Sequence, residues 1–307
     1  MTIDIRGATC LVTGYGFVSR HLVQRLLREG ADVTVIEKAF VPDRILDSKS
    51  KILNMEIRDL TDRLEFDYTF HLAAVANPGY AERSPIDAIE ANILGTLALL
   101  QRVKTRKMFL FSSSSNVYGE STKQLSEMDA TRPINVYGVT KLAAEELIRV
   151  YGRKVGLNYT ILRFFTLYGP GAAPIYIIPQ ICIQALRDRN IVIRDGTVRR
   201  DFLYVEDAVD LILCIVKSGI RNEVVNVGYG EATSILDVAV HLSRMINGGP
   251  IPVQEKGIKD LQSPPAQIAD ISKAKSLGWT PHTTLEQGLR KTLDYYMTSL
   301  GMDSSLG

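Results

Sequence analysis

Hydrophobic positions along the chain alternate between short continuous runs and stretches with helical spacing. Residues 8–13 form an apolar, β-branched run, which is typical of a strand buried on both faces of a parallel sheet. Apolar residues three and four apart then predict an amphipathic helix over residues 20–29, and residues 32–36 predict a second strand. This order predicts an α/β fold, a Rossmann doubly wound parallel sheet with helices on both faces. Further strand-like runs cover residues 51–57, 68–72, 107–111 and 159–163, and helix-like stretches cover residues 85–102 and 136–155.

The alternation becomes irregular after residue 166. Residues 167–174 are rich in glycine and proline, which predicts a loop. We expect a first domain over residues 1–166, to which a later strand and helices return, and a smaller C-terminal α/β substrate lobe over most of residues 167–307. In this second part, predicted helices cover residues 175–188, 205–218, 235–246, 271–277 and 285–300, and predicted short strands cover residues 191–194, 224–227 and 251–254.

Composition narrows the possible functions. The net charge of the 307 residues is +2 at pH 7, and the sequence has no basic stripe, so we expect no nucleic-acid partner. No apolar stretch reaches about 18 residues, which predicts no membrane span. The first residues lack the pattern of a signal peptide, which predicts a cytoplasmic protein. The cysteines lie far apart in apolar runs and the histidines show no ligand spacing, so we expect neither a disulfide framework nor a metal site.

The first predicted strand leads into a glycine turn. Gly14 and Gly16 directly follow residues 8–13, the predicted helix comes next, and Glu37 ends the second strand. Glycines let the backbone approach a pyrophosphate at a helix N-terminus, and an acid about 20 residues further on suits a ribose 2′-hydroxyl. The acid repels the 2′-phosphate of NADP, whereas Lys38 would attract it, and we favour NAD. On these residues alone, a tight turn without a ligand stays open.

A tyrosine and a lysine form the candidate catalytic pair. Tyr137 and Lys141 are four residues apart on a predicted helix, one turn from each other. A neighbouring ammonium favours the phenolate, so we expect Lys141 to lower the pKa of Tyr137. The serine-rich segment 111–119 precedes them and could supply a hydroxyl that shares a substrate oxygen with the phenol. Such a group transfers a proton when a carbon that bears oxygen is oxidised or reduced.

Taken together, these motifs resemble those of the extended short-chain dehydrogenases/reductases, in the branch of NAD-dependent nucleotide-sugar epimerases and dehydratases. The resemblance covers nearly the whole chain. It implies a Rossmann fold, bound NAD, a nucleotide-sugar substrate, and a homodimer that pairs helices 85–102 and 136–155 of two copies into a four-helix bundle. The matching segments are residues 13–17, 71–74, 92–96, 112–119, 133–141, 162–170, 200–205, 269–274 and 277–281.

The resemblance also implies roles for individual residues. Tyr137 would be the acid/base, Lys141 would bind the nicotinamide ribose, and Ser114 would hydrogen-bond the reacting oxygen. Arg200 would pair with the pyrophosphate of the nucleotide sugar, a task that suits a rigid, forked guanidinium. The implied cofactor-binding residues are Gly14, Gly16, Phe17, Val18, Glu37, Lys38, Glu56, Ile57, Leu72, Ala73, Ala74, Ser112, Tyr137 and Lys141. The implied substrate-binding residues are Ser114, Ser115, Asn116, Thr166 and Arg200.

The chain departs from the family pattern in several places. The glycine turn is one residue shorter than usual, and Ser19 stands at its last glycine. Thr166 stands where the family has an asparagine that faces the substrate phosphates. Residues 260–265 replace an arginine-containing element, so one phosphate-binding arginine is missing. These departures leave the identity of the nucleotide open.

The sequence Ser114-Ser115-Asn116 bears on the type of reaction. At these positions, the 4,6-dehydratases of this family carry a sequence like Thr-Asp-Glu, and the decarboxylases carry one like Thr-Ser-Glu. Without such an acid, elimination lacks a proton donor. We therefore predict epimerisation of a nucleotide-diphosphate sugar, as by a UDP-sugar 4-epimerase, through a transient keto-sugar. The alternatives are a dehydratase, reductase or decarboxylase of an unusual sugar nucleotide, and a catalytically idle NAD-binding interaction protein.

Overall fold

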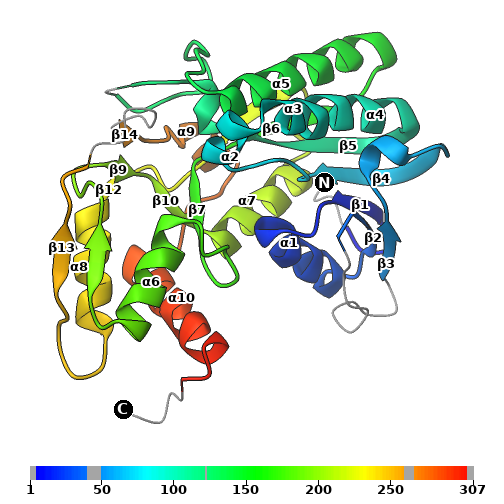
Figure 1. The fold of residues 1–307 in the computed structure, drawn as a ribbon. Coiled ribbons are helices and arrows are strands. Elements are labelled where there is room, and N and C mark those ends of the chain that lie inside the picture. The colour runs from blue at the N-terminus through cyan, green and yellow to red at the C-terminus, as the bar shows by residue number, and fades with distance from the viewer. Residues whose placement is uncertain (1–4, 40–49, 122, 259–265, 303–307) are drawn as a thin grey trace.

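A parallel sheet of seven strands forms the centre of the protein. The computed structural model describes residues 5–39, 50–121, 123–258 and 266–302. The strands of this sheet are β1 (Thr9–Thr13), β2 (Asp32–Glu37), β3 (Ser50–Asn54), β4 (Leu64–His71), β5 (Val103–Ser114), β6 (Tyr159–Phe164) and β11 (Glu223–Val227). Their order is β11-β6-β5-β4-β1-β2-β3, with helices on both faces (Figure 1). The predicted doubly wound Rossmann fold is confirmed.

The residues of β1 show why both faces of the sheet are covered. The helices that share hydrophobic cores with it are α1 (Phe17–Arg28), α4 (Gly95–Arg102), α5 (Val136–Val155) and α7 (Val205–Ser218). Cys10 and Val12 belong to one hydrophobic core with residues of α1 and α7, whereas Leu11 belongs to a second core with residues of α4 and α5. Because alternate residues of a strand point to opposite faces, a strand between two cores needs an unbroken apolar run.

A smaller lobe packs against one end of the sheet and has its own hydrophobic core. Its helices are α6 (Ile177–Arg187), α8 (Ile235–Met245) and α10 (Leu285–Ser299). Its short strands are β7 (Thr166–Tyr168), β8 (Ile191–Ile193), β9 (Arg199–Arg200), β10 (Phe202–Tyr204), β12 (Thr233–Ser234), β13 (Val253–Glu255) and β14 (Ala266–Gln267). They pair as β10-β7, β12-β9-β14 and β13-β8. Later segments return to the large sheet: β11 pairs with β6, and α9 (Ser272–Ser276) contacts β11.

The predicted helix over residues 85–102 is not continuous. It consists of α3 (Pro85–Ile89), a π-helical turn (Glu90–Leu94) and α4, and it is preceded by α2 (Pro78–Arg83). A π-turn widens the helix and often marks a functional site. Here Asn92 lies in that turn, buried, and its amide reaches the backbone of Val75 and the hydroxyl of Thr140.

Other boundaries also differ from the prediction. The strand predicted over residues 51–57 ends at Asn54, and a 3₁₀ turn covers Ile57–Asp59. Part of the loop predicted over residues 167–174 is strand β7, because Thr166–Tyr168 pairs in register with Phe202–Tyr204. Strands of two or three residues carry no period of their own, so their partners, and not their sequence, define them.

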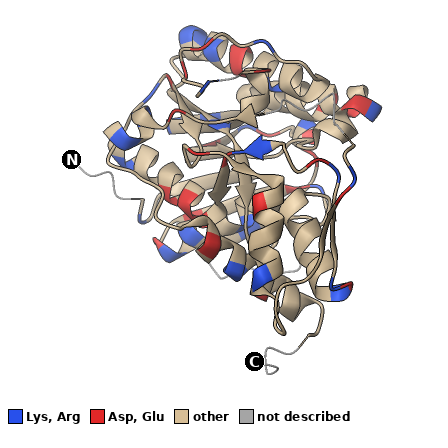
Figure 2. Ribbon diagram, turned by 90° about the vertical axis from the view of Figure 1, so that its left-hand side faces the viewer, with Lys and Arg blue, Asp and Glu red and all other residues tan. Residues whose placement is uncertain are grey.

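Charged residues of both signs are interspersed over the surface. In Figure 2, blue and red segments alternate along the described helices and loops. Among the described residues, no helix has the length and apolarity needed to cross a membrane.

Candidate active site

A pocket of about 950 Å³ opens where the carboxyl ends of the central strands meet the smaller lobe. Ligands of doubly wound sheets bind at this edge, where strand order reverses. All the residues to which the resemblance assigns cofactor or substrate contacts line this one pocket. The fold therefore brings together segments that lie far apart in sequence. The individual roles stay predictions.

The glycine turn at the base of the pocket has room for a phosphate. Gly14 adopts a φ of +79°, and a Cβ there would lie 3.0 Å from the Cα of Ala73. Gly16 precedes α1, and a Cβ at this residue would meet nothing within 4 Å. Ser19 fits at the family's glycine position because its hydroxyl turns back to donate to the carbonyl of Gly16 at 3.2 Å. The shortened turn thus keeps an open helix N-terminus that suits a dinucleotide.

The acid at the end of β2 is tied to this turn. One carboxylate oxygen of Glu37 accepts from the backbone N–H of Tyr15 at 2.7 Å, and the other accepts from that of Ala39 at 2.9 Å. Each oxygen keeps a lone pair for a ribose hydroxyl. Beside it, Lys38 and Arg58 form ion pairs with Glu56, which lower the pKa of that carboxyl. This end of the pocket suits the adenosine half of a dinucleotide.

The candidate catalytic hydroxyl is positioned by two asparagines. Ser114, at the end of β5, accepts from the backbone and side-chain nitrogens of Asn116 at 3.2 and 3.1 Å. Asn116 in turn accepts from Asn135, whose side chain caps α5 by accepting from the N–H of Gly138. The proton of Ser114 is therefore left for the phenol of Tyr137, with which Ser114 forms a hydrogen bond. The chain of contacts fixes the distance between β5 and the start of α5.

Burial shifts the pKa values of the catalytic pair in opposite directions. It raises the pKa of Tyr137 to about 12, although a hydrogen bond with Ser114 lowers it in part. It lowers the pKa of Lys141 to about 7, against the attraction of Glu145. The expectation that Lys141 gives Tyr137 a low pKa is therefore wrong for this structure. Desolvation disfavours the charged form of both groups and is the main cause of both shifts.

A buried ionic network lies behind this pair, and the sequence analysis missed it. Glu145, one turn after Lys141 on α5, accepts from Arg163 at 3.0 and 2.8 Å and from Arg149 at 2.9 Å. It also accepts from the hydroxyl of Ser113 at 2.5 Å. Since Ser113 precedes Ser114, the network joins the catalytic strand end to the catalytic helix. The spacing of four from Lys141 was the only local signal.

A second buried chain of hydrogen bonds connects the glycine turn to α5. His71 contacts Thr13 at 2.7 Å and Thr96 at 2.9 Å, and burial lowers its pKa to about 3. Thr96 donates to the backbone carbonyl of Asn92. The side-chain amide of Asn92 in turn donates to the hydroxyl of Thr140 on α5. Thr140 donates to the carbonyl of Tyr137 at 2.8 Å. His71 is therefore a neutral structural link.

The substrate side of the pocket is built from the smaller lobe. Arg200 on β9 pairs in register with Gln267 on β14, and both line the pocket. Asp201, next to Arg200, is fully buried and accepts from the backbone N–H groups of Tyr229, Gly230 and Ala269, which fixes this segment. Thr166 begins β7. Residues 260–265, where the sequence lacks the expected arginine, lie outside the described residues.

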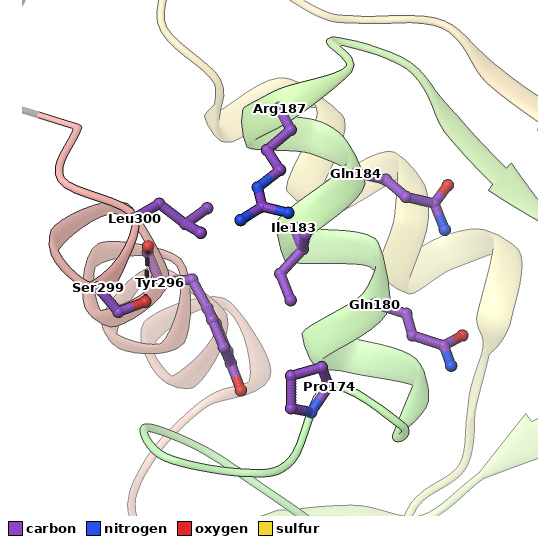
Figure 3. Close-up of a pocket in the computed structure, with 8 residues that line it drawn as sticks. All are labelled: Pro174, Gln180, Ile183, Gln184, Arg187, Tyr296, Ser299 and Leu300. Carbon is purple, nitrogen blue, oxygen red and sulfur yellow. Dashed lines mark hydrogen bonds between the residues drawn. The ribbon is translucent and has the colours of Figure 1, made fainter.

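Two further features lie away from this pocket. Asp207, Asp210 and His282 form a group with the residue types of a metal site. Asp207 is already used to accept three hydrogen bonds from His282 and Thr283. A second hollow of about 440 Å³ lies between α6 and α10 (Figure 3). Among the described residues that line it, Arg187 is the one with a charged side chain.

The comparisons with known proteins identify the family. The model of the NAD dependent epimerase/dehydratase family matches residues 10–228 of the chain. The chain belongs to this family. Its cofactor is therefore NAD, and the resemblance inferred from the motifs is confirmed. Members of the family include epimerases, dehydratases and decarboxylases that act on nucleotide sugars.

Individual relatives have different activities. The chain is 34% identical to an uncharacterized UDP-glucose epimerase of Bacillus subtilis, over 93% of this chain and 96% of the relative. It is 30% identical to a UDP-N-acetyl-alpha-D-glucosaminuronate decarboxylase of Bacillus cytotoxicus, over 94% and 97%. The solved UDP-glucuronic acid 4-epimerase of Bacillus cereus, in complex with UDP-glucuronic acid and NAD, is similar with a TM-score of 0.86 and 31% identity, over 95% and 99%. Similarity therefore supports an NAD-dependent enzyme of this family. The type of reaction has to be inferred from the residues of the site.

Proposed function

We propose that the protein is an NAD-dependent 4-epimerase of a UDP-sugar. The observation that carries this proposal is the absence of an acid beside the catalytic hydroxyls. Among the described residues that line the pocket, the only carboxylates are Glu37 and Glu56, at the adenosine end. Elimination of water needs a second acid/base near the sugar, and Ser115 and Asn116 cannot supply it. Reversible oxidation and reduction of one carbon would need, besides NAD, only the tyrosine and its partners.

In this proposal each residue of the pocket has a distinct role. NAD, when bound, would supply reversible hydride transfer. Tyr137 takes the proton of the sugar 4-hydroxyl and gives it back to the same oxygen, while Ser114 donates a hydrogen bond to that oxygen. Lys141 binds the nicotinamide ribose. Arg200 pairs with the diphosphate, and Glu37 holds the adenosine ribose.

Two other functions are less well supported. Decarboxylation has a precedent in the relative from Bacillus cytotoxicus, but Asn116 stands where the family's decarboxylases carry a glutamate. A catalytically idle NAD-binding protein would have no need for the contacts that orient Ser114 toward α5. These contacts support an active enzyme.

We also propose a homodimer. Apolar side chains that are 39–64% exposed lie on α3 and the start of α5, at Ile86, Ile89 and Val139. An uncovered apolar face of this kind favours association with a second copy. Sedimentation at micromolar protein concentration tests this, and a monomer would contradict it. The division into an NAD-binding domain and a substrate lobe, and the cytoplasmic location, stay predictions.

The product decides between the proposed reactions. NAD-loaded protein should be incubated with UDP-, dTDP-, GDP- and CDP-sugars, and the products should be identified by NMR. We expect interconversion of 4-epimers with no loss of carbon or water. Formation of a 4-keto-6-deoxy sugar would show that the enzyme is a dehydratase, and formation of a pentose would show that it is a decarboxylase. Absence of any product across the panel would favour the idle protein.

A further inference from the structure

We propose that Ser115 and Gln267 form an acceptor corner of the pocket that selects a sugar with a neutral hydroxymethyl group over one with a carboxylate. This inference rests on the proposed function and names its class of substrate. The two residues are 152 positions apart in sequence, yet the hydroxyl of Ser115 lies 3.1 Å from the amide oxygen of Gln267. Both line the pocket, and they are only 5% and 6% exposed.

The orientation of the Gln267 amide follows from its neighbours. Its nitrogen lies 3.2 Å from the carbonyl oxygen of Ser115 and 3.3 Å from that of Gly119. A carbonyl can only accept, so the side-chain nitrogen must face these two atoms. Both protons of the amide are then used. The amide oxygen faces the Ser115 hydroxyl, and because that oxygen cannot donate, Ser115 must.

The atoms of Ser115 and Gln267 that remain free to form hydrogen bonds can only accept them. Serine has a single proton, and Ser115 gives it to Gln267. What is left at the corner is the lone pairs on Ser115 Oγ and on Gln267 Oε1. Ser114 differs, because its hydroxyl accepts twice from Asn116 and directs its proton to the phenol of Tyr137, beside which the reacting oxygen would lie. Adjacent serines therefore act as a donor at the reacting oxygen and as an acceptor beside it.

The acceptor corner lies next to the atoms that react. In the proposed function Ser114 and Tyr137 address the oxygen on C4, and our proposal places the corner at Ser115 and Gln267 beside C5, one of the two neighbouring ring carbons. In a hexose, C5 carries a hydroxymethyl group, and in a uronic acid it carries a carboxylate. A hydroxymethyl group can donate its proton to the corner. A carboxylate has only lone pairs and a charge, and a buried charge without a partner is strongly disfavoured.

Arg200 does not remove this selectivity. It is paired with Gln267 across the β9–β14 ladder and lines the same pocket. In the proposed function its guanidinium faces the diphosphate, whose negative charge already exceeds that of one arginine. A uronate would add a further anion to the pocket, and the two residues of the acceptor corner supply no cation.

Binding measurements test this inference without depending on turnover. We would titrate NAD-loaded protein with UDP-glucose and with UDP-glucuronic acid by calorimetry, and we expect UDP-glucose to bind at least about tenfold more tightly. Gln267→Met keeps the length of the side chain and releases the Ser115 proton for a carboxylate. The affinity ratio of the two sugars should then shift toward UDP-glucuronic acid by about tenfold.

A matched control separates selectivity from damage to the fold. Gln254→Met makes the same change on β13, at an exposed residue outside the pocket, and should leave both affinities unchanged. Equal or tighter binding of UDP-glucuronic acid by the wild type would overturn the inference and leave the epimerase proposal intact. The inference would also be overturned if Gln267→Met folds and leaves the affinity ratio of the two sugars unchanged. Loss of a glutamine with a purely structural role would change the binding of both sugars alike. Failure of both sugars to bind would contradict the proposed UDP-sugar substrate and this inference together.

Discussion

The two ends of the pocket use the same types of charged residue in opposite surroundings. At the adenosine end, the side chains of Lys38, Glu56 and Arg58 form ion pairs while they are 36–69% exposed. At the catalytic end, Glu145 and Arg163 form a pair with side chains that are 0% and 4% exposed. Water screens the first set of charges and is excluded from the second.

This difference indicates which end of the pocket has the more firmly fixed geometry. A buried pair is costly to break, because one partner is left charged without solvent, whereas an exposed pair contributes little. Ser113 and Arg163 are register partners on β5 and β6, and both bind Glu145 on α5. The catalytic end is thus fixed in part by Glu145 and Arg163, which do not line the pocket. We expect substitutions there to have large effects, and those at the adenosine end to have small ones.

The strongest test of this comparison is Tyr137→Phe. Turnover of the identified sugar should fall by about 10²–10⁴-fold, the usual contribution of a positioned general acid/base. NAD affinity should stay nearly unchanged, because the ring that lines the pocket is kept. Single-turnover kinetics and NAD titration measure the two effects separately.

Ser114→Ala is the matched variant for this test. It removes one neutral hydrogen bond and no proton carrier, so its effect should be smaller than that of Tyr137→Phe. If Tyr137→Phe kept near-normal turnover, another residue would carry the proton and the proposed mechanism would be wrong.

The same contrast explains how much of the site could be predicted. Gly14, Glu37 and the Tyr137–Lys141 pair belong to patterns that are local in sequence, and these patterns also predicted the central sheet. Gln267 could not be found in this way, because its partner Ser115 is 152 residues away. Short strands such as β9 and β14 exist only through such pairing.

Burial was the other quantity that the sequence did not reveal. The spacing of Tyr137 and Lys141 correctly places them on one helix, but it does not show that both are more than 90% buried. Desolvation then reverses the expected direction of the tyrosine pKa shift. Likewise, the polar residue Asn92 gave no sign that it would lie in a π-turn, because its partners, Val75 after β4 and Thr140 on α5, are 17 and 48 residues away in sequence.

A second test breaks the buried ion pair. Glu145→Leu should lower the free energy of unfolding by about 3–5 kcal/mol, because Arg163 is left charged in the core. The double variant Glu145→Leu with Arg163→Met should recover much of this loss, since neither charge remains. Urea unfolding of the wild type, both single variants and the double variant measures the coupling.

An exposed pair supplies the control for this cycle. Lys104 and Glu65 have side chains that are 73% and 44% exposed, and Lys104→Ala should cost less than about 1 kcal/mol. A similar cost for Lys104→Ala and Glu145→Leu would contradict the contrast between buried and exposed charges.

A third test uses the pH dependence of stability. The pKa of Lys141 is lowered by burial to about 7, whereas an unfolded lysine titrates near about 10.4. Between these values the unfolded chain holds a proton that the folded chain has released, so this residue makes stability rise with pH. The free energy of unfolding of the wild type minus that of Lys141→Met should increase by up to about 1.4 kcal/mol per pH unit across this window. A difference that stays flat would show that Lys141 remains charged in the folded protein.

The smallest expected effect is at the adenosine end. Lys38→Ala removes a cation that is 69% exposed and pairs with Glu56, and a screened surface pair contributes about 0–1 kcal/mol. The affinity for NAD should therefore change by less than about fivefold. Glu37→Gln should weaken NAD binding more, because that carboxylate accepts from the glycine turn and from Ala39 and is proposed to hold the ribose. Calorimetric titration with NAD compares the two variants. A larger loss for Lys38→Ala than for Glu37→Gln would mean that the exposed charges, and not the acid anchored to the turn, hold the cofactor.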